Sequence, residues 1–461
     1  MKQISLNNSL KYISLGLALV FSHKSIAYSQ DDFNQIINKY KLSKDHVGIV
    51  IENQNKLVFE NNPKKQFIPA SISKLVTSFS ILKNFELNQK FKTELYSDGF
   101  NLYIKGGGDP SFVSENMWFL VNEFTRQNSK IIKGDIIVDD SYFDKVRFDD
   151  SRESKRVDRS YDAPVGAMSF NWNSINIFVK PTVDGEKAQV VLDPTSQYFE
   201  LINKTTTRSK VHKELIIDVN QSKRIITVSG DVSKNADEKA YYKNVAEPDL
   251  WAGENLKAFL EQRGIKVLGK VKSGVVSSKA TKVATYEGKS LSAVLADMNK
   301  FSNNFVAEML TKNLAAQSGT IPATLSAGIQ KINQDLRSVG LGVDQILFEN
   351  PSGFTRENKI SAYAIVAVLK EMQNDFRLFP TILDSLPISG VDGTLKKRMK
   401  DEQVQGFVRG KTGYLDGVVS LAGYAGLKNG DILRFAFLYN GPQDEGKVRE
   451  CFDQILTLLL K

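Results

Sequence analysis

The chain of 461 residues contains a single cysteine, and no apolar run in it reaches the length of a membrane-spanning helix. One cysteine cannot form an intramolecular disulfide, so packing has to stabilise the fold. Cys451, Phe452, Ile455 and Leu459 follow one another at the spacing of one helix face. This spacing predicts that Cys451 lies on the buried face of a last helix.

The sequence is also poor in histidine, with only His23, His46 and His212. None of them stands in a metal-ligand or nucleophile-type motif, so neither a Ser-His-Asp enzyme nor a histidine-rich metal site is expected. We expect no metal and no organic cofactor. A serine hydrolase with this sequence needs a base other than histidine.

The composition excludes further classes of protein. The 41% hydrophobic and 25% charged residues are typical of a globular protein rather than a collagen-like, coiled-coil or disordered chain. The net charge of +9 comes from lysine and arginine spread along the chain without a recognition motif, so a nucleic-acid partner is not expected. The simpler interpretation of the positive charge is a solvated basic surface. The alternative is that the charge contacts anionic wall polymers or lipid head groups. The sequence is compatible with peripheral membrane contact and with a homodimer, and it decides neither.

Residues 1–27 have the pattern of a secretory signal. Lys2 and Lys11 give a positive start, residues 12–22 are mostly apolar, and Ser25-Ile26-Ala27 resembles a small-residue cleavage site. The alternative is an uncleaved membrane anchor, which the shortness of the apolar run disfavours. We therefore expect an exported protein, located in the periplasm or on the exterior of the cell envelope.

The pattern of apolar residues divides the rest of the chain. Residues 31–94 and 286–461 combine helical and strand-like periods, including a hairpin pattern at residues 47–59. Residues 95–285 consist mainly of short alternating runs broken by Gly, Asn, Asp and Lys. We expect a mixed α/β domain built from both ends of the chain and interrupted by a largely β insertion of one or two small domains.

A serine and a lysine at a predicted helix start could replace the missing histidine. Ser71 and Lys74 are three residues apart and share a helix face. Lysine can act as a base when burial and neighbouring positive charge lower its pKa. With Ser-Asn-Asn at residues 302–304 and Lys-Thr-Gly at 411–413, the Ser-x-x-Lys motif completes the set of penicillin-binding proteins and β-lactamases. Similar short patterns begin at Ser80, Ser174 and Lys272, but they lack this order and context.

The combination resembles the class C low-molecular-mass penicillin-binding proteins, the D-alanyl-D-alanine carboxypeptidase and endopeptidase family. Further similar segments are residues 106–110, 134–139, 161–164, 352–356 and 390–395. The long separation of Ser71 from Ser302 is also family-like, since these proteins insert domains there and β-lactamases do not. The resemblance implies a transpeptidase-like domain with an antiparallel sheet flanked by helices.

The resemblance also implies a role for each motif residue. Ser71 would be the acylated nucleophile, Lys74 its base, and Ser302 a relay that passes a proton to the departing D-alanine. Asn304 would hold the substrate amide, and Lys411 would add positive potential.

The remaining implied residues bind substrate. Thr412 would bind the terminal carboxylate, and the backbone N–H groups of Ser71 and Tyr414 would form the oxyanion hole. Asp158 would bind the charged amino end of a diaminopimelate side chain, with Asp139 or Asp140 as alternatives. Tyr414 stands where the family has Ser or Thr, and Pro351 replaces a common glycine.

The expected function is that of a serine D,D-carboxypeptidase or endopeptidase. It would cleave D-alanyl-D-alanine-type bonds of peptidoglycan stem peptides and bind β-lactams covalently. The alternatives are a β-lactamase, which the long insertion argues against, and a wall-binding protein that has lost catalysis, which intact Ser71, Lys74 and Lys411 argue against.

Overall fold

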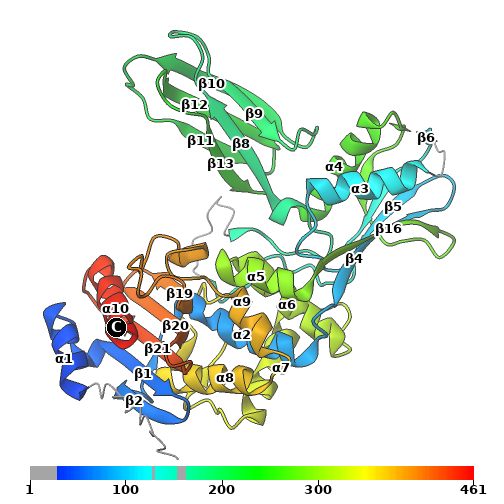
Figure 1. Ribbon diagram of the computed structural model, residues 1–461. Coiled ribbons are helices and arrows are strands. Elements are labelled where there is room, and N and C mark those ends of the chain that lie inside the picture. Colours follow the sequence, from blue (N-terminus) through cyan, green and yellow to red (C-terminus); the bar gives the residue numbers. More distant parts are fainter. Residues whose placement is uncertain (1–28, 127–129, 153–161) are drawn as a thin grey trace, which may run out of the picture.

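The computed structural model describes residues 29–126, 130–152 and 162–461. Both ends of the chain build one large α/β domain, which is the lower part of the molecule in Figure 1, and the middle of the chain builds the upper part. We call these parts the catalytic domain and the insertion.

The catalytic domain is organised around a five-stranded antiparallel sheet. Its strands, in spatial order, are β19 Val408–Leu415, β20 Val418–Gly426, β21 Ile432–Asn440, β1 Val47–Asn53 and β2 Lys56–Asn61. The hairpin predicted at residues 47–59 is confirmed as β1 and β2. Because β1 also pairs with β21, the sheet joins the two ends of the chain.

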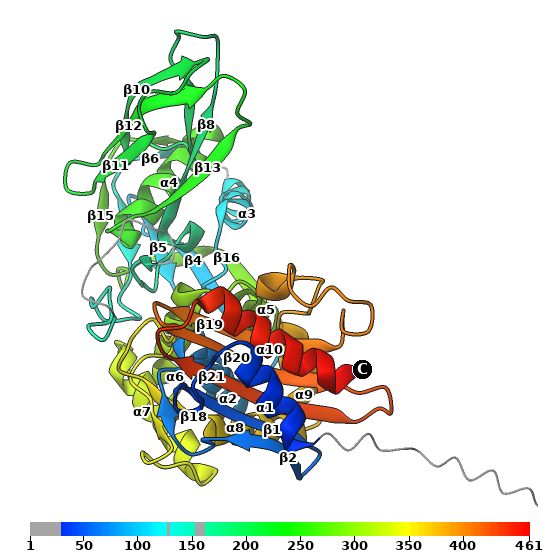
Figure 2. The same cartoon turned by 90° about the vertical axis from the view of Figure 1, so that its left-hand side faces the viewer.

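Helices cover both faces of this sheet (Figure 2). On one face, α1 Gln30–Lys39 and α10 Glu445–Leu460 pack on residues such as Ile49 and Phe437. Cys451 is fully buried in this layer, as its spacing predicted. The alternate residue Val50 faces the other layer, as the two-residue period of a strand requires.

That other layer is largely helical, with a small sheet of β17 Ile346–Leu347, β18 Lys359–Ser361 and β3 Gln66–Phe67 beside the helices. It contains α2 Ser73–Asn84, α5 Leu291–Lys300, α6 Asn304–Gln317, α7 Leu325–Ser338, α8 Ala362–Asn374 and α9 Phe379–Ser385. Because α2 and α6 are buried between the sheet and the other helices, residues at their first turns are held rigidly. Among the described residues, no helix is long and apolar enough to cross a membrane.

The insertion begins and ends on neighbouring strands. Its first sheet has the order β15 Val271–Ser273, β7 Ile136–Asp139, β5 Leu102–Gly106, β4 Lys90–Ser97 and β16 Thr281–Ser290. The chain leaves the catalytic domain on β4 and returns on the antiparallel β16. The limits expected at residues 94 and 286 fall inside these two strands, and the division into domains stays a prediction.

The far end of the insertion consists of two three-stranded sheets. One contains β13 Lys239–Asn244, β8 Ser174–Lys180 and β9 Gln189–Asp193, and the other contains β10 Glu200–Arg208, β12 Ile225–Ser233 and β11 Ile216–Asn220. The expected fold class, an α/β domain with a largely β insertion, is confirmed. Two helices in the insertion were not predicted, α3 Ser114–Thr125 and α4 Pro248–Gln262.

Candidate active site

Ser71 lies in a single 3-10 turn, Ala70–Ile72, immediately before α2. Ala70 has a φ of +49°, a conformation that non-glycine residues rarely adopt and that marks local strain. Gly413 on β19 packs directly against this turn, and a Cβ at Gly413 would lie 2.7 Å from the carbonyl oxygen of Pro69 and 3.0 Å from the nitrogen of Ser71. Glycine is therefore required for the Lys-Thr-Gly strand to approach the serine.

Lys74 lies on the first turn of α2 and is fully buried. Its Nζ is 3.0 Å from the Oγ of Ser71, 2.7 Å from the Oδ1 of Asn304 and 2.5 Å from the carbonyl oxygen of Ser352. Burial and, after it, the positive charge of Lys411 hold the pKa of Lys74 well below its ordinary value. An amine with these surroundings loses its proton readily beside a serine hydroxyl.

Ser302 and Lys411 form a second pair. Ser302 stands in the turn between α5 and α6 with a φ of +55°, and the Nζ of Lys411 donates a hydrogen bond of 2.8 Å to its Oγ. The side chain of Asn303 caps α6 by accepting from the N–H of Val306. Burial lowers the pKa of Lys411 to about 7.

Thr412 and Tyr414 alternate with Lys411 and Gly413 along β19. The Oγ1 of Thr412 donates to the Oγ1 of Thr394 at 2.8 Å. The ring of Tyr414 is half exposed, and the guanidinium of Arg449 on α10 lies 5.0 Å from its centre. The side chain of Tyr414 thus lies on the face of the sheet that α10 covers. Ser71 precedes α2, which lies on the other face.

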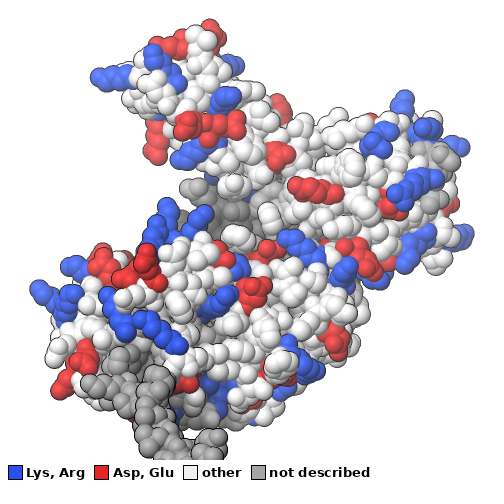
Figure 3. Space-filling model, viewed as in Figure 1, with Lys and Arg blue, Asp and Glu red and all other residues white. Residues whose placement is uncertain are grey.

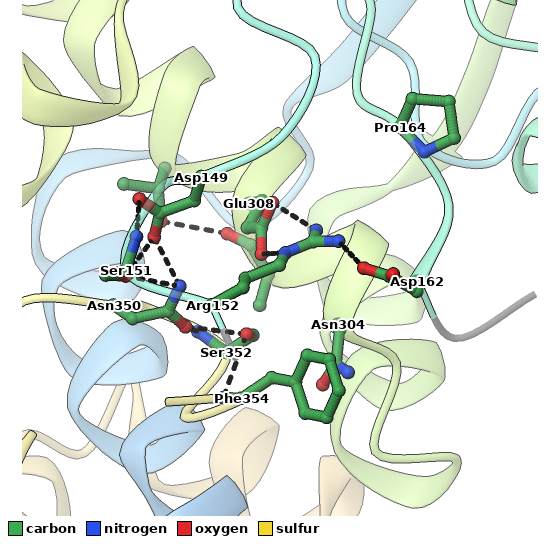
Figure 4. A network of polar contacts seen from close by, with 12 residues as sticks. Asp149, Ser151, Arg152, Asp162, Pro164, Asn304, Glu308, Asn350, Ser352 and Phe354 are labelled. Atoms are coloured by element: carbon green, nitrogen blue, oxygen red, sulfur yellow. Dashed lines mark hydrogen bonds and ion pairs between the residues drawn. The ribbon is translucent and has the colours of Figure 1, made fainter. Parts of the chain in front are cut away.

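A buried charge cluster connects the insertion to the helix of Asn304 (Figure 4). Arg152 binds Glu308 through two hydrogen bonds, Nε to Oε1 at 2.9 Å and Nη2 to Oε2 at 2.5 Å. Its Nη1 donates to Asp162 at 2.7 Å. All three side chains are almost fully buried, and Glu308 stands one helical turn after Asn304 on α6.

Asn350 makes a second connection, to the loop that contacts Lys74. Its Oδ1 accepts from the N–H groups of Ser352 and Gly353, both at 2.9 Å, and its Nδ2 donates to Asp149 and to the Oγ of Ser151. The carbonyl that accepts from Lys74 is therefore fixed by residues of the insertion. Sequence analysis missed both connections, although Glu308, four residues after Asn304, shares its helix face.

The structure thus brings together Ser71, Lys74, Ser302, Asn304, Lys411 and Gly413. Asp158 lies outside the described residues. Its two alternatives serve the insertion itself: Asp139 accepts from the N–H groups of Ser141 and Val276, and Asp140 pairs with Arg147.

The similar motif that begins at Ser80 is structural, because the Oγ of this buried serine donates to Asp335. Over the described parts of the chain, no three His, Cys, Asp or Glu side chains are grouped to hold a metal ion.

Comparison with known proteins identifies the family. The chain matches the D-Ala-D-Ala carboxypeptidase 3 (S13) family over residues 29–460, and it belongs to that family. It is 28% identical to a D-alanyl-D-alanine carboxypeptidase of Actinomadura sp. (strain R39), over 89% of this chain and 81% of the relative. It is 25% identical to the D-alanyl-D-alanine carboxypeptidase DacB of Haemophilus influenzae, over 94% of each chain.

Solved structures show the same fold. The crystal structure of penicillin binding protein 4 (dacB) from Haemophilus influenzae superposes with a TM-score of 0.80 at 21% identity, covering 93% of this chain and 99% of the other. The predatory endopeptidase Bd0816 from Bdellovibrio bacteriovorus gives a TM-score of 0.55 at 17% identity, covering 90% and 93%. The resemblance inferred from the motifs is confirmed.

Proposed function

We propose that this protein is a serine D,D-carboxypeptidase or endopeptidase that cleaves D-alanyl-D-alanine-type bonds of peptidoglycan stem peptides. The observation that carries the proposal is the contact of 3.0 Å between the Nζ of Lys74 and the Oγ of Ser71. Burial and the charge of Lys411 lower the pKa of Lys74. A neutral amine within hydrogen-bond distance of a hydroxyl is the requirement for a lysine base.

In the proposed acylation step, Lys74 takes the proton of Ser71 as the Oγ attacks the carbonyl carbon of the scissile amide. The backbone N–H groups of Ser71 and Tyr414 bind the developing oxyanion, and such donors contribute roughly 2.7 to 4 kcal/mol each in other serine hydrolases. The C–N bond then breaks, and Ser302 relays a proton to the departing amine. Water hydrolyses the ester, releases the peptide and restores the serine.

Substrate is held from two sides in this proposal. The Nδ2 of Asn304 binds the substrate amide, since its Oδ1 accepts from Lys74. Thr412 binds the terminal carboxylate, and the protonated form of Lys411 attracts it. A β-lactam would enter the same site and acylate Ser71, because its strained amide takes the place of the scissile bond.

Two further parts of the proposal concern residues outside the described ranges. Asp158 binds the ammonium group of a diaminopimelate side chain. Residues 1–27 act as a secretory signal, so the enzyme works in the periplasm or outside the cell, where its substrate is.

Mass spectrometry after exposure to benzylpenicillin tests the proposed function. The protein should gain the mass of one penicilloyl group, and digestion should place it on the peptide that contains Ser71. Ser71→Ala should remove the label completely. Ser80→Ala is the matched control, because Ser80 begins a similar motif further along α2 and its hydroxyl donates to Asp335 instead. Labelling that persists in Ser71→Ala would overturn the assignment.

A further inference from the structure

A cleft of about 850 Å³ lies beside the active site, between the catalytic domain and the insertion. The space-filling view shows the molecule hollowed between these two parts (Figure 3). Residues 301–304 form one wall, and their Ser302 and Asn304 belong to the active site. The start of α3 and the sheet of β8 and β13 form the others. Anything bound in this cleft therefore lies next to the reacting atoms.

Trp172 lines this cleft and lies in a strained turn. Asn171, Trp172 and Asn173 have φ values of +49°, +52° and +50° in succession, a left-handed conformation that is strained for a residue as bulky as tryptophan. Hydrogen bonds hold the turn: Asn171 accepts from the N–H of Ser114 at 2.9 Å, and Asn173 donates to the carbonyl of Pro164 at 2.8 Å. The indole nevertheless stays 43% exposed, although tryptophan usually buries its large apolar surface.

Other exposed aromatic rings continue from Trp172. Tyr242 and Phe301 line the same cleft and are 52% and 71% exposed. Ser114 and Glu115, which also line it, open onto a second hollow of about 760 Å³ that contains Trp118 and Phe119 of α3. Trp118 lies four residues after Ser114 on α3, or about 6 Å further along the helix at 1.5 Å per residue, so the rings continue from the cleft that Ser302 lines into the second hollow. We call this row of rings the aromatic track.

Polar groups stand between the rings of the aromatic track. Glu115 lies where the two hollows meet, and Asn176 and Asp193 line the cleft near Trp172. Within the described residues, the indole N–H groups of Trp118 and Trp172 have no hydrogen-bond partner. A ligand that fits must have apolar faces for the rings and hydroxyl or amide groups at its edges. The carboxylates disfavour an anionic polymer.

Linear chains of amino sugars have this chemistry, because each ring has an apolar face and a polar rim and repeats along a line. We propose that the aromatic track binds the glycan strand of peptidoglycan while the stem peptide attached to that strand enters the site at Ser71. The proposal rests on the proposed function and adds the sugar chain to its substrate. If a sugar ring stacked on an aromatic side chain contributes as much as a pair of aromatic rings does, binding rises roughly two- to tenfold.

Two substrates separate this proposal from its alternatives: the free stem pentapeptide, and the same peptide attached to its disaccharide. The wild-type enzyme should have a kcat/KM at least roughly twofold higher on the disaccharide substrate. Trp172→Ala should remove most of this preference and leave the rate on the free peptide unchanged. Trp118→Ala should act in the same direction on longer glycan chains. Phe376→Ala is the control, since Phe376 is 89% exposed and lines neither hollow.

Three results would overturn the proposal. Equal kcat/KM of the wild type on both substrates would exclude a sugar contact. If Trp172→Ala and the milder Trp172→Phe each lowered kcat/KM equally on both substrates, the turn would act in folding and not in sugar binding. A loss confined to cross-linked peptides, with or without sugar, would assign the track to a second peptide. Benzylpenicillin acylation of Ser71 is measured in parallel, because its failure would contradict the proposed function rather than the aromatic track.

Discussion

Two lysine side chains of the site have lowered pKa values but different surroundings. Lys74 contacts three oxygen acceptors, including the hydroxyl of Ser71. Lys411 contacts the hydroxyl of Ser302 and the carbonyl of its own neighbour Thr412. In the proposed mechanism, Lys74 takes the proton of Ser71, and Lys411 polarises the hydroxyl of Ser302.

Exchanging each lysine for arginine should separate these roles. Lys74→Arg should lower the rate of benzylpenicillin acylation by several orders of magnitude, because a guanidinium stays protonated and cannot act as a base. Lys411→Arg keeps the positive charge and should retain more activity. The acylation rate constant of each variant, measured by stopped-flow with a chromogenic β-lactam, checks the prediction. Equal and mild effects of both changes would contradict a lysine base.

The pH dependence of acylation should report the same two groups. If Lys74 is the base, as proposed, its neutral form is the active one, and the rate should fall as pH falls through its lowered pKa. Protonated Lys411 lowers that pKa and itself loses its proton at a pKa of about 7. In Lys411→Met the pKa of Lys74 should rise, and the acid limb of the kcat/KM profile should move to higher pH. An acid limb that stays in place would show that the two lysines are not coupled.

At the scale of elements, α6 and the loop at Ser352 each contribute to the site and are each bound by the insertion. Arg152 reaches Glu308 on α6, and Asp149 and Ser151 reach Asn350 beside the loop. The insertion therefore takes part in positioning Asn304 and the acceptor of Lys74, beyond any contact with substrate.

Breaking the Arg152–Glu308 pair should destabilise the protein strongly. Arg152→Met leaves Glu308 buried without its bidentate partner, at a cost of about 3 to 5 kcal/mol. The double change Arg152→Met with Glu308→Leu should recover only part of this loss, because the buried Asp162 still loses its ion pair with Arg152. Arg377→Met is the matched control, since Arg377 pairs with Asp375 on the surface, where solvent screens the pair and its loss should change stability little. Thermal unfolding of the four proteins checks the prediction. A Tm of Arg152→Met equal to that of the control would refute it.

For the molecule as a whole, predictions from sequence succeeded where contacts are local. Ser71 and Lys74 meet because they are one helical turn apart, and the hairpin of β1 and β2 follows from alternation and a short turn. The charge cluster could not be predicted, because a buried Arg152 and a surface arginine have the same local sequence signal. The helix α3 was missed because Trp118 and Phe119 are apolar but exposed, which hides its helical period.

The last prediction concerns Asp158 and the substrate of the enzyme. Asp158 lies outside the described residues, between Arg152 and Asp162, whose side chains are bound to each other beside α6. A carboxylate facing a substrate ammonium contributes about 1.5 to 3 kcal/mol. Asp158→Asn should therefore lower kcat/KM for diaminopimelate-containing peptide by roughly one to two orders of magnitude and leave benzylpenicillin acylation almost unchanged. The control is Asp150→Asn, an exposed carboxylate of the same segment, which should change neither rate. If Asp158→Asn lowers both rates together, Asp158 supports the fold, and if it changes neither, another group binds the ammonium.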